Sequence, residues 1–70
     1  MKKINKIEIK VNGKFKFIPE NYKISNLVTD LNIPLKKVAI ELNQEIIDKK
    51  KISKIILKKN DKIEIVHFIG

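Results

Sequence analysis

The dipeptide Asn12-Gly13 constrains the fold of this chain more than any other feature. Both residues tolerate positive φ, and between two stretches of alternating apolar residues they are the strongest short signal of a β-hairpin. Alternation over residues 7–11 predicts a half-buried strand, and residues 14–18 form its return strand, which Pro19 ends. We therefore expect the first two strands of the sheet to form a tight hairpin.

The register of this hairpin is open between two pairings. A two-residue turn pairs Val11 with Lys14 and leaves Phe15 and Phe17 on the face away from the core. A three-residue loop with a bulge turns both phenylalanines inward. Burying a phenylalanine is worth about 1.5–3 kcal/mol and an inward lysine is costly, so the bulge is favoured. Without the bulge, two exposed aromatic rings would form a partner-binding patch.

One amphipathic helix is predicted after the hairpin. Apolar residues recur at i, i+3, i+4 and i+7, the stripe of a helix that packs against a core. These residues are Ile24, Leu27, Val28 and Leu31. Ser25 is the expected N-terminal cap, although a start at Lys23 is also open. Asn32 ends the helix, and Pro34 keeps it from continuing.

The second half of the chain contains three more predicted strands. Alternation predicts strands over 38–42 and 63–69, and a short strand over 45–47 follows a turn at residues 43–44. The lysine run 49–51 is expected to be a solvated loop. Isoleucines then recur at i, i+3 and i+4, which predicts a short helical turn that plugs the side of the core. They are Ile52, Ile55 and Ile56.

Composition limits what a chain of 70 residues can do. It has no cysteine and one histidine, which excludes thiolate chemistry and a histidine-based zinc site. The net charge is +8, but every basic residue is lysine. Because arginine is the usual reader of guanine and phosphate, we expect a solvated lysine surface rather than a nucleic-acid site. No apolar run could span a bilayer and no signal peptide is evident, so a cytoplasmic location without membrane partners is expected.

The order of these elements predicts one domain over residues 1–70 of the α+β class. A hairpin followed by a helix and a return strand lays one main helix across one face of a sheet. The closing strand is expected in the centre, parallel to the first strand, which makes a mixed sheet of four to five strands. This order, with a glycine at the end, resembles the ubiquitin-like β-grasp roll.

Within that fold the chain resembles the sulfur carrier proteins of thiamine biosynthesis, the ThiS proteins. The resemblance covers residues 7 to 70, and it depends on the spacing of all its segments. They are Val11-Asn12-Gly13, Ile18-Pro19-Glu20, the helical stripe, residues 38–47 and residues 60–70.

The resemblance implies that the C-terminal carboxylate on Gly70 is the working group. An E1-like adenylyltransferase (ThiF-type) would adenylate it with ATP, and sulfur from a cysteine desulfurase relay would convert it to a thiocarboxylate. A thiazole synthase (ThiG-type) would then accept the sulfur. The chain would be a protein co-substrate that binds no cofactor of its own. The family ends in Gly-Gly, whereas this sequence ends in Ile69-Gly70 after Phe68.

The surface beside the tail is a separate hypothesis. If Ile63 and Ile65 face the helix, Val66 and Phe68 lie on the outer face near the tail and form a docking patch. The hypothesised partner-binding residues are Val66, Phe68 and the adjoining Ile69. The other interpretation is that Phe68 folds back over the sheet edge. His67 is interpreted as an ordinary strand residue.

Two other functions stay open at this stage. The small subunit of molybdopterin synthase is also a β-grasp sulfur carrier, although such chains tend to be longer. A lysine-rich β-grasp module that binds RNA or acidic proteins belongs to a different class. Removing Gly70 would change nothing in such a module, and its binding would fall steeply with salt.

Overall fold

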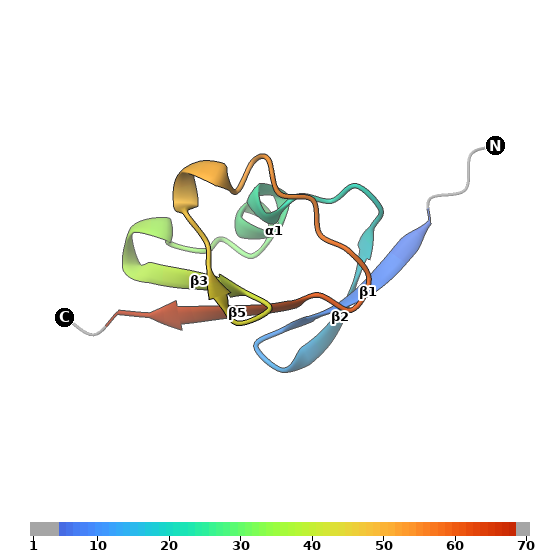
Figure 1. The fold of residues 1–70 in the computed structure, drawn as a ribbon, viewed down its shortest axis with the longest axis horizontal. Coiled ribbons are helices and arrows are strands. Elements are labelled where there is room, and N and C mark those ends of the chain that lie inside the picture. The colour runs from blue at the N-terminus through green and yellow to red at the C-terminus, as the bar shows by residue number, and fades with distance from the viewer. Residues whose placement is uncertain (1–4, 69–70) are drawn as a thin grey trace.

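The computed structural model describes residues 5–68, which form a five-stranded mixed sheet with one α-helix across one face (Figure 1). The elements in chain order are β1 (Lys6–Val11), β2 (Lys14–Pro19), α1 (Ile24–Asp30), η1 (Leu35–Lys37), β3 (Val38–Leu42), β4 (Glu45–Ile46), η2 (Lys49–Lys51) and β5 (Lys62–His67). The strand order is β2-β1-β5-β3-β4. β1 and β5 are parallel, and the other pairs are antiparallel. The predicted fold class and the central closing strand are confirmed.

The bulged register favoured for the first hairpin is wrong. Val11 pairs with Lys14 across a two-residue turn, in which Asn12 and Gly13 have φ of 50° and 81°. Two positive φ values make a type I′ turn, whose twist matches that of the flanking strands.

This register places Ile18 opposite Ile7 on the core side of the sheet, where Ile18 is almost fully buried. Lys14 and Lys16 share that side, but β2 is an edge strand, so their ammonium groups can reach water. The free-energy cost of placing a lysine on the core side of β2 is therefore small. The consequence is that Phe15 and Phe17 are exposed, each at 65%.

Both ends of α1 are capped, but not by the side chain expected. The helix begins after Lys23, whose backbone N–H donates to Oδ1 of Asn26 over 2.8 Å, so Ser25 is not the cap. At the other end Asn32 has φ of 52°, and its N–H donates to the Thr29 carbonyl over 3.2 Å. The N–H of Ile33 donates to the Val28 carbonyl over 3.0 Å. These bonds form a Schellman motif, which satisfies the last carbonyls of the helix.

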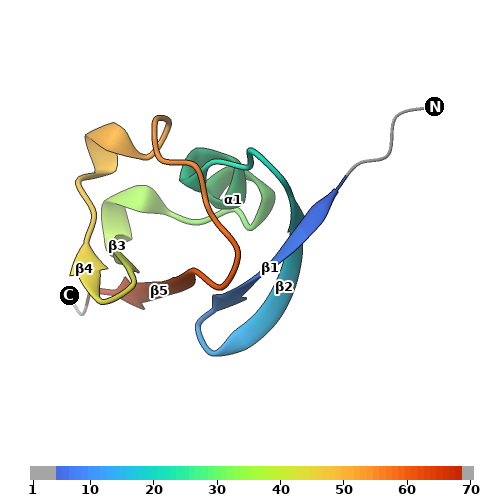
Figure 2. The ribbon, with the colours of Figure 1, turned by 45° about the vertical axis from the view of Figure 1, so that its right-hand side comes forward.

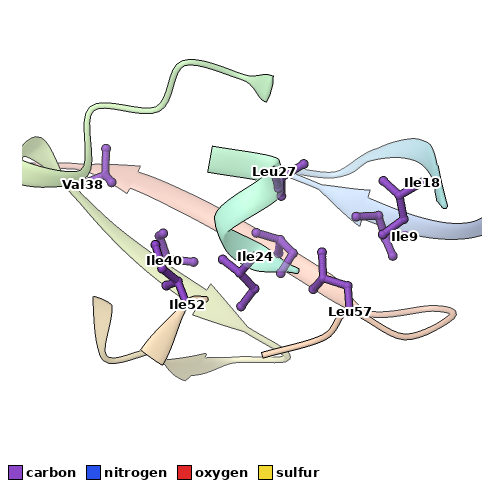
Figure 3. Packing of buried hydrophobic residues seen from close by; sticks show 9 residues of the cluster. Ile9, Ile18, Ile24, Leu27, Val38, Ile40, Ile52 and Leu57 are labelled. Carbon is purple, nitrogen blue, oxygen red and sulfur yellow. The ribbon is translucent and has the colours of Figure 1, made fainter. Parts of the chain in front are cut away.

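The core lies between the sheet and α1 (Figure 3). Within residues 5–68 the nine buried residues are all aliphatic: Ile9, Ile18, Ile24, Leu27, Val38, Ile40, Ile52, Leu57 and Ile63. Two members of the predicted helical stripe lie at its margin, because Val28 is half-buried and Leu31 is 42% exposed. A helix of seven residues is short enough that only its first turn covers the centre of the sheet.

The connection between β4 and β5 differs most from the prediction. The lysine run forms the 3₁₀ helix η2 instead of a loop, and the connection passes alongside α1 (Figure 2). Of the three isoleucines predicted to plug the core, Ile52 is buried, Ile55 is half-buried and Ile56 is 45% exposed. Leu57 is buried in place of Ile56, because its N–H donates to the Tyr22 carbonyl over 2.8 Å.

The same connection caps the start of α1. The N–H groups of Ile24 and Ser25 donate to the carbonyls of Ile55 and Ile52, each over 3.1 Å. The first N–H groups of any helix have no partner within the helix, so a neighbouring carbonyl stabilises them. The connection therefore closes the side of the core and holds the helix in place over β5.

Candidate functional site

The C-terminal end of β5 is the candidate site, because the proposed working tail continues from it. β5 lies between β1 and β3, and its last residue, His67, pairs with Val38. The ladder continues one residue further, since the N–H of Phe68 donates to the Lys37 carbonyl over 2.8 Å. The chain is therefore held in the sheet up to Phe68. Ile69 and Gly70, the other predicted tail residues, lie outside the described residues.

Two turn asparagines clasp β5, one from each side. Oδ1 of Asn12 accepts the N–H of Ile65 over 2.7 Å, and Nδ2 of Asn12 donates to the Ile65 carbonyl over 3.3 Å. On the other side, Oδ1 of Asn43 accepts the N–H of Lys62 over 2.9 Å, and Nδ2 donates to Oδ1 of Asp61 over 3.0 Å. The sequence showed these asparagines only as turn residues. Their bonds to β5 depend on residues 18 or more positions away.

We expect Asn12→Gly to lower the free energy of unfolding by about 1–2 kcal/mol, because it keeps the positive φ but removes two hydrogen bonds to β5. Asn32→Gly is the matched control. Asn32 also has positive φ, but it caps α1 through backbone bonds, so glycine there should be neutral or slightly stabilising. Urea denaturation of both variants checks this difference, and equal losses would contradict the clasp.

The ring of Phe68, just before the tail, contacts the ammonium group of a lysine. Its ring is 58% exposed, and Nζ of Lys49 lies 5.3 Å from the ring centroid. The same ammonium group donates to the carbonyl of Leu35. An ammonium group over an aromatic ring is attracted by the ring's quadrupole, so Lys49 positions Phe68 without burying it. This role of Lys49 could not be predicted from the sequence, because Lys49 is the first of three consecutive lysines.

Val66 is 48% exposed and pairs with Ala39 of β3. Side chains alternate along a strand, and Ile63 is buried while Ile65 is half-buried, so Val66 lies on the outer face of the sheet. Val66 and Phe68 are therefore accessible to a partner. Whether a partner binds there stays a prediction.

A metal centre needs several His, Asp or Glu side chains close together. Within residues 5–68 no three His, Asp or Glu side chains are grouped closely enough to hold a metal ion. His67 is exposed and occupies an ordinary place in the β3–β5 ladder. Over the same residues, none of the helices has the length and apolarity to cross a membrane.

A mixed sheet of this order, with one helix across it and the last strand in the centre, defines a ubiquitin-like β-grasp protein. The structure is similar to the crystal structure of a thiamine biosynthesis protein (ThiS) from Geobacter metallireducens, with a TM-score of 0.82 at 25% identity. The match covers 91% of this chain and 97% of that one. The chain belongs to the ThiS family, whose family model matches residues 3–70. The resemblance inferred from the sequence is confirmed.

A further relative is a larger protein. The chain is 31% identical over 64 residues to a thiazole synthase from Paramagnetospirillum magneticum. The match covers 91% of this chain but only 20% of that protein. The chain thus spans about a fifth of the length of this curated relative.

Proposed function

We propose that the chain is a cytoplasmic sulfur carrier of thiazole formation in thiamine biosynthesis, with the carboxylate of Gly70 as the group that is modified. A ThiF-type adenylyltransferase joins this carboxylate to the AMP of ATP and releases pyrophosphate. Sulfur supplied through a cysteine desulfurase then displaces AMP, which leaves a thiocarboxylate. A ThiG-type thiazole synthase accepts that sulfur. The chain itself is a co-substrate, and ATP is bound by the activating partner.

The observation that carries the proposal is the family match, which runs through Gly70. Glycine suits the role because it has no side chain to block a narrow passage to a nucleotide. The thiazole synthase with a segment similar to this chain supports the choice of acceptor. Asn12 and Asn43 contribute by holding β5, the strand that precedes the tail, in register.

The intact mass of the chain tests the proposal. We expect the chain incubated with ATP, the activating enzyme and a sulfur donor to gain the mass that replaces one oxygen by sulfur. Fragmentation should place the change in the terminal peptide. A variant without Gly70 is the matched control and should gain nothing.

The same experiment should be run on a variant with one glycine added after Gly70, because the family ends in Gly-Gly. An unchanged mass for this extended variant would overturn the proposal. A gain for the extended variant alone would support the proposal and show that efficient activation needs the second glycine.

A further inference from the structure

The exposed aromatic pair on β2 has no role in the fold or in the tail. Phe15 and Phe17 are two positions apart on one strand, so both rings lie on the outer face of the sheet. Each is 65% exposed. Single exposed apolar residues are ordinary, but two neighbouring aromatic rings on one face form a patch of the kind that binds partners. We call Phe15, Phe17, Lys10 and Lys62 the hairpin surface.

The hairpin surface is separate from the patch beside the tail. Phe15 lies opposite Lys10 of β1, which in turn pairs with Lys62 at the start of β5. Val66 is four residues further along β5, about 13 Å away along that strand, and β2 is about 10 Å across the sheet from β5. The pair of carboxylates on Glu41 and Glu64 lies between the two regions.

The charge around Phe15 indicates what would bind there. Nζ of Lys10 lies 4.9 Å from the centroid of the Phe15 ring, and Lys62 pairs with Lys10 on the same face of the sheet. A hollow of about 140 Å³ opens beside it. Its lining residues are Glu8, Ile9, Lys10, Phe15, Asn60 and Lys62.

This hollow fits a side chain better than a free ligand. Pockets for small molecules usually measure about 300–1,000 Å³, so a hollow of this size has room for a single side chain. The two ammonium groups of Lys10 and Lys62 outnumber the one carboxylate of the lining, that of Glu8, so the hollow favours a carboxylate over a cation. The Phe15 ring supplies the apolar contact beside it.

We propose that the hairpin surface docks an acidic protein, with one Asp or Glu of that partner in the hollow and apolar side chains on the rings of Phe15 and Phe17. A single-stranded nucleic acid fits less well, because the chain has no arginine to pair with its phosphates. The choice of probe proteins rests on the proposed function; the surface itself rests on the geometry of the hairpin.

The experiment measures binding of the chain to the purified activating enzyme and to the purified thiazole synthase of the same organism. Two double variants are compared with the wild type: Phe15→Ser with Phe17→Ser, and Lys10→Glu with Lys62→Glu. We expect both to bind at least one of the two enzymes about tenfold or more weakly. Their melting temperatures should be unchanged, because these side chains are outside the core. Lys36→Glu with Lys51→Glu is the charge control, since both lysines are exposed and lie outside the hairpin.

Several outcomes would contradict the proposed docking role of the hairpin surface. One is that the hairpin variants bind both enzymes as tightly as the wild type does. A charge control that loses as much affinity as the Lys10 and Lys62 variant would show an unspecific effect of charge. Polyuridine that binds the wild type but not the Phe15 and Phe17 variant would assign the surface to nucleic acid. If the wild type gains sulfur while all hairpin variants bind normally, only this inference fails. If neither the wild type nor the variant with one added glycine gains sulfur, the proposed function fails.

Discussion

Replacing Leu57 by alanine should lower the free energy of unfolding by about 2–5 kcal/mol, the usual cost of such a cavity in a core. Leu57 is 1% exposed and packs among the residues that join the sheet to α1. Its backbone also bonds to Tyr22, so the cavity would weaken the segment that leads into the helix. A domain of this size has little stability to spare, and we expect a large fraction of Leu57→Ala to be unfolded at ambient temperature.

Ile56→Ala is the matched control for this prediction. Ile56 is adjacent in sequence, has a side chain of the same size and is 45% exposed, so its loss should cost about 1 kcal/mol or less. Circular dichroism during urea denaturation measures both variants. Equal destabilisation would contradict the burial of Leu57 in place of Ile56.

Replacing Phe68 by aspartate should slow thiocarboxylate formation by about tenfold or more while leaving the melting temperature nearly unchanged. The ring is more than half exposed at the root of the tail, so an activating enzyme that receives the tail would contact it. A charge at that position would have to be desolvated on docking, which is costly. The rate of mass gain with ATP, the activating enzyme and a sulfur donor measures the effect.

Phe68→Leu is the control, because it keeps an apolar side chain at the same position and should retain most of the activity. A large fall in the melting temperature of Phe68→Asp would show that the ring supports the fold and would end the docking hypothesis. Wild-type activity of Phe68→Asp would have the same consequence.

Most of the fold could be predicted from the sequence because its signals are local. Asn12-Gly13 indicated the first hairpin, although not its two-residue register, and Asn43-Gln44 indicated a second turn, where the structure has φ of 52° and 73°. Alternation located β1, β3 and β5 to within a residue or two. The central, parallel place of β5 followed from the order of the elements.

The site was predicted less completely. Phe68 and Val66 were identified as exposed positions beside the tail, and the structure places both there. The clasps of Asn12 and Asn43 and the contact of Lys49 with Phe68 were missed. These contacts join residues from distant segments, and a turn asparagine or a lysine in a charged run carries no local sign of them.

The sequence by itself determined which residues share a face of a strand or helix, because φ preferences and side-chain periodicity act within a few residues. Only the tertiary structure decided which face is covered. Phe15 and Phe17 are exposed because β2 follows its type I′ turn and buries Ile18 instead. Leu57 is buried because the connection from β4 to β5 bonds to the start of α1. For Phe15 and Phe17 the register of the hairpin, and for Leu57 the bonds between segments distant in sequence, outweighed the intrinsic preference of a large apolar side chain for the core.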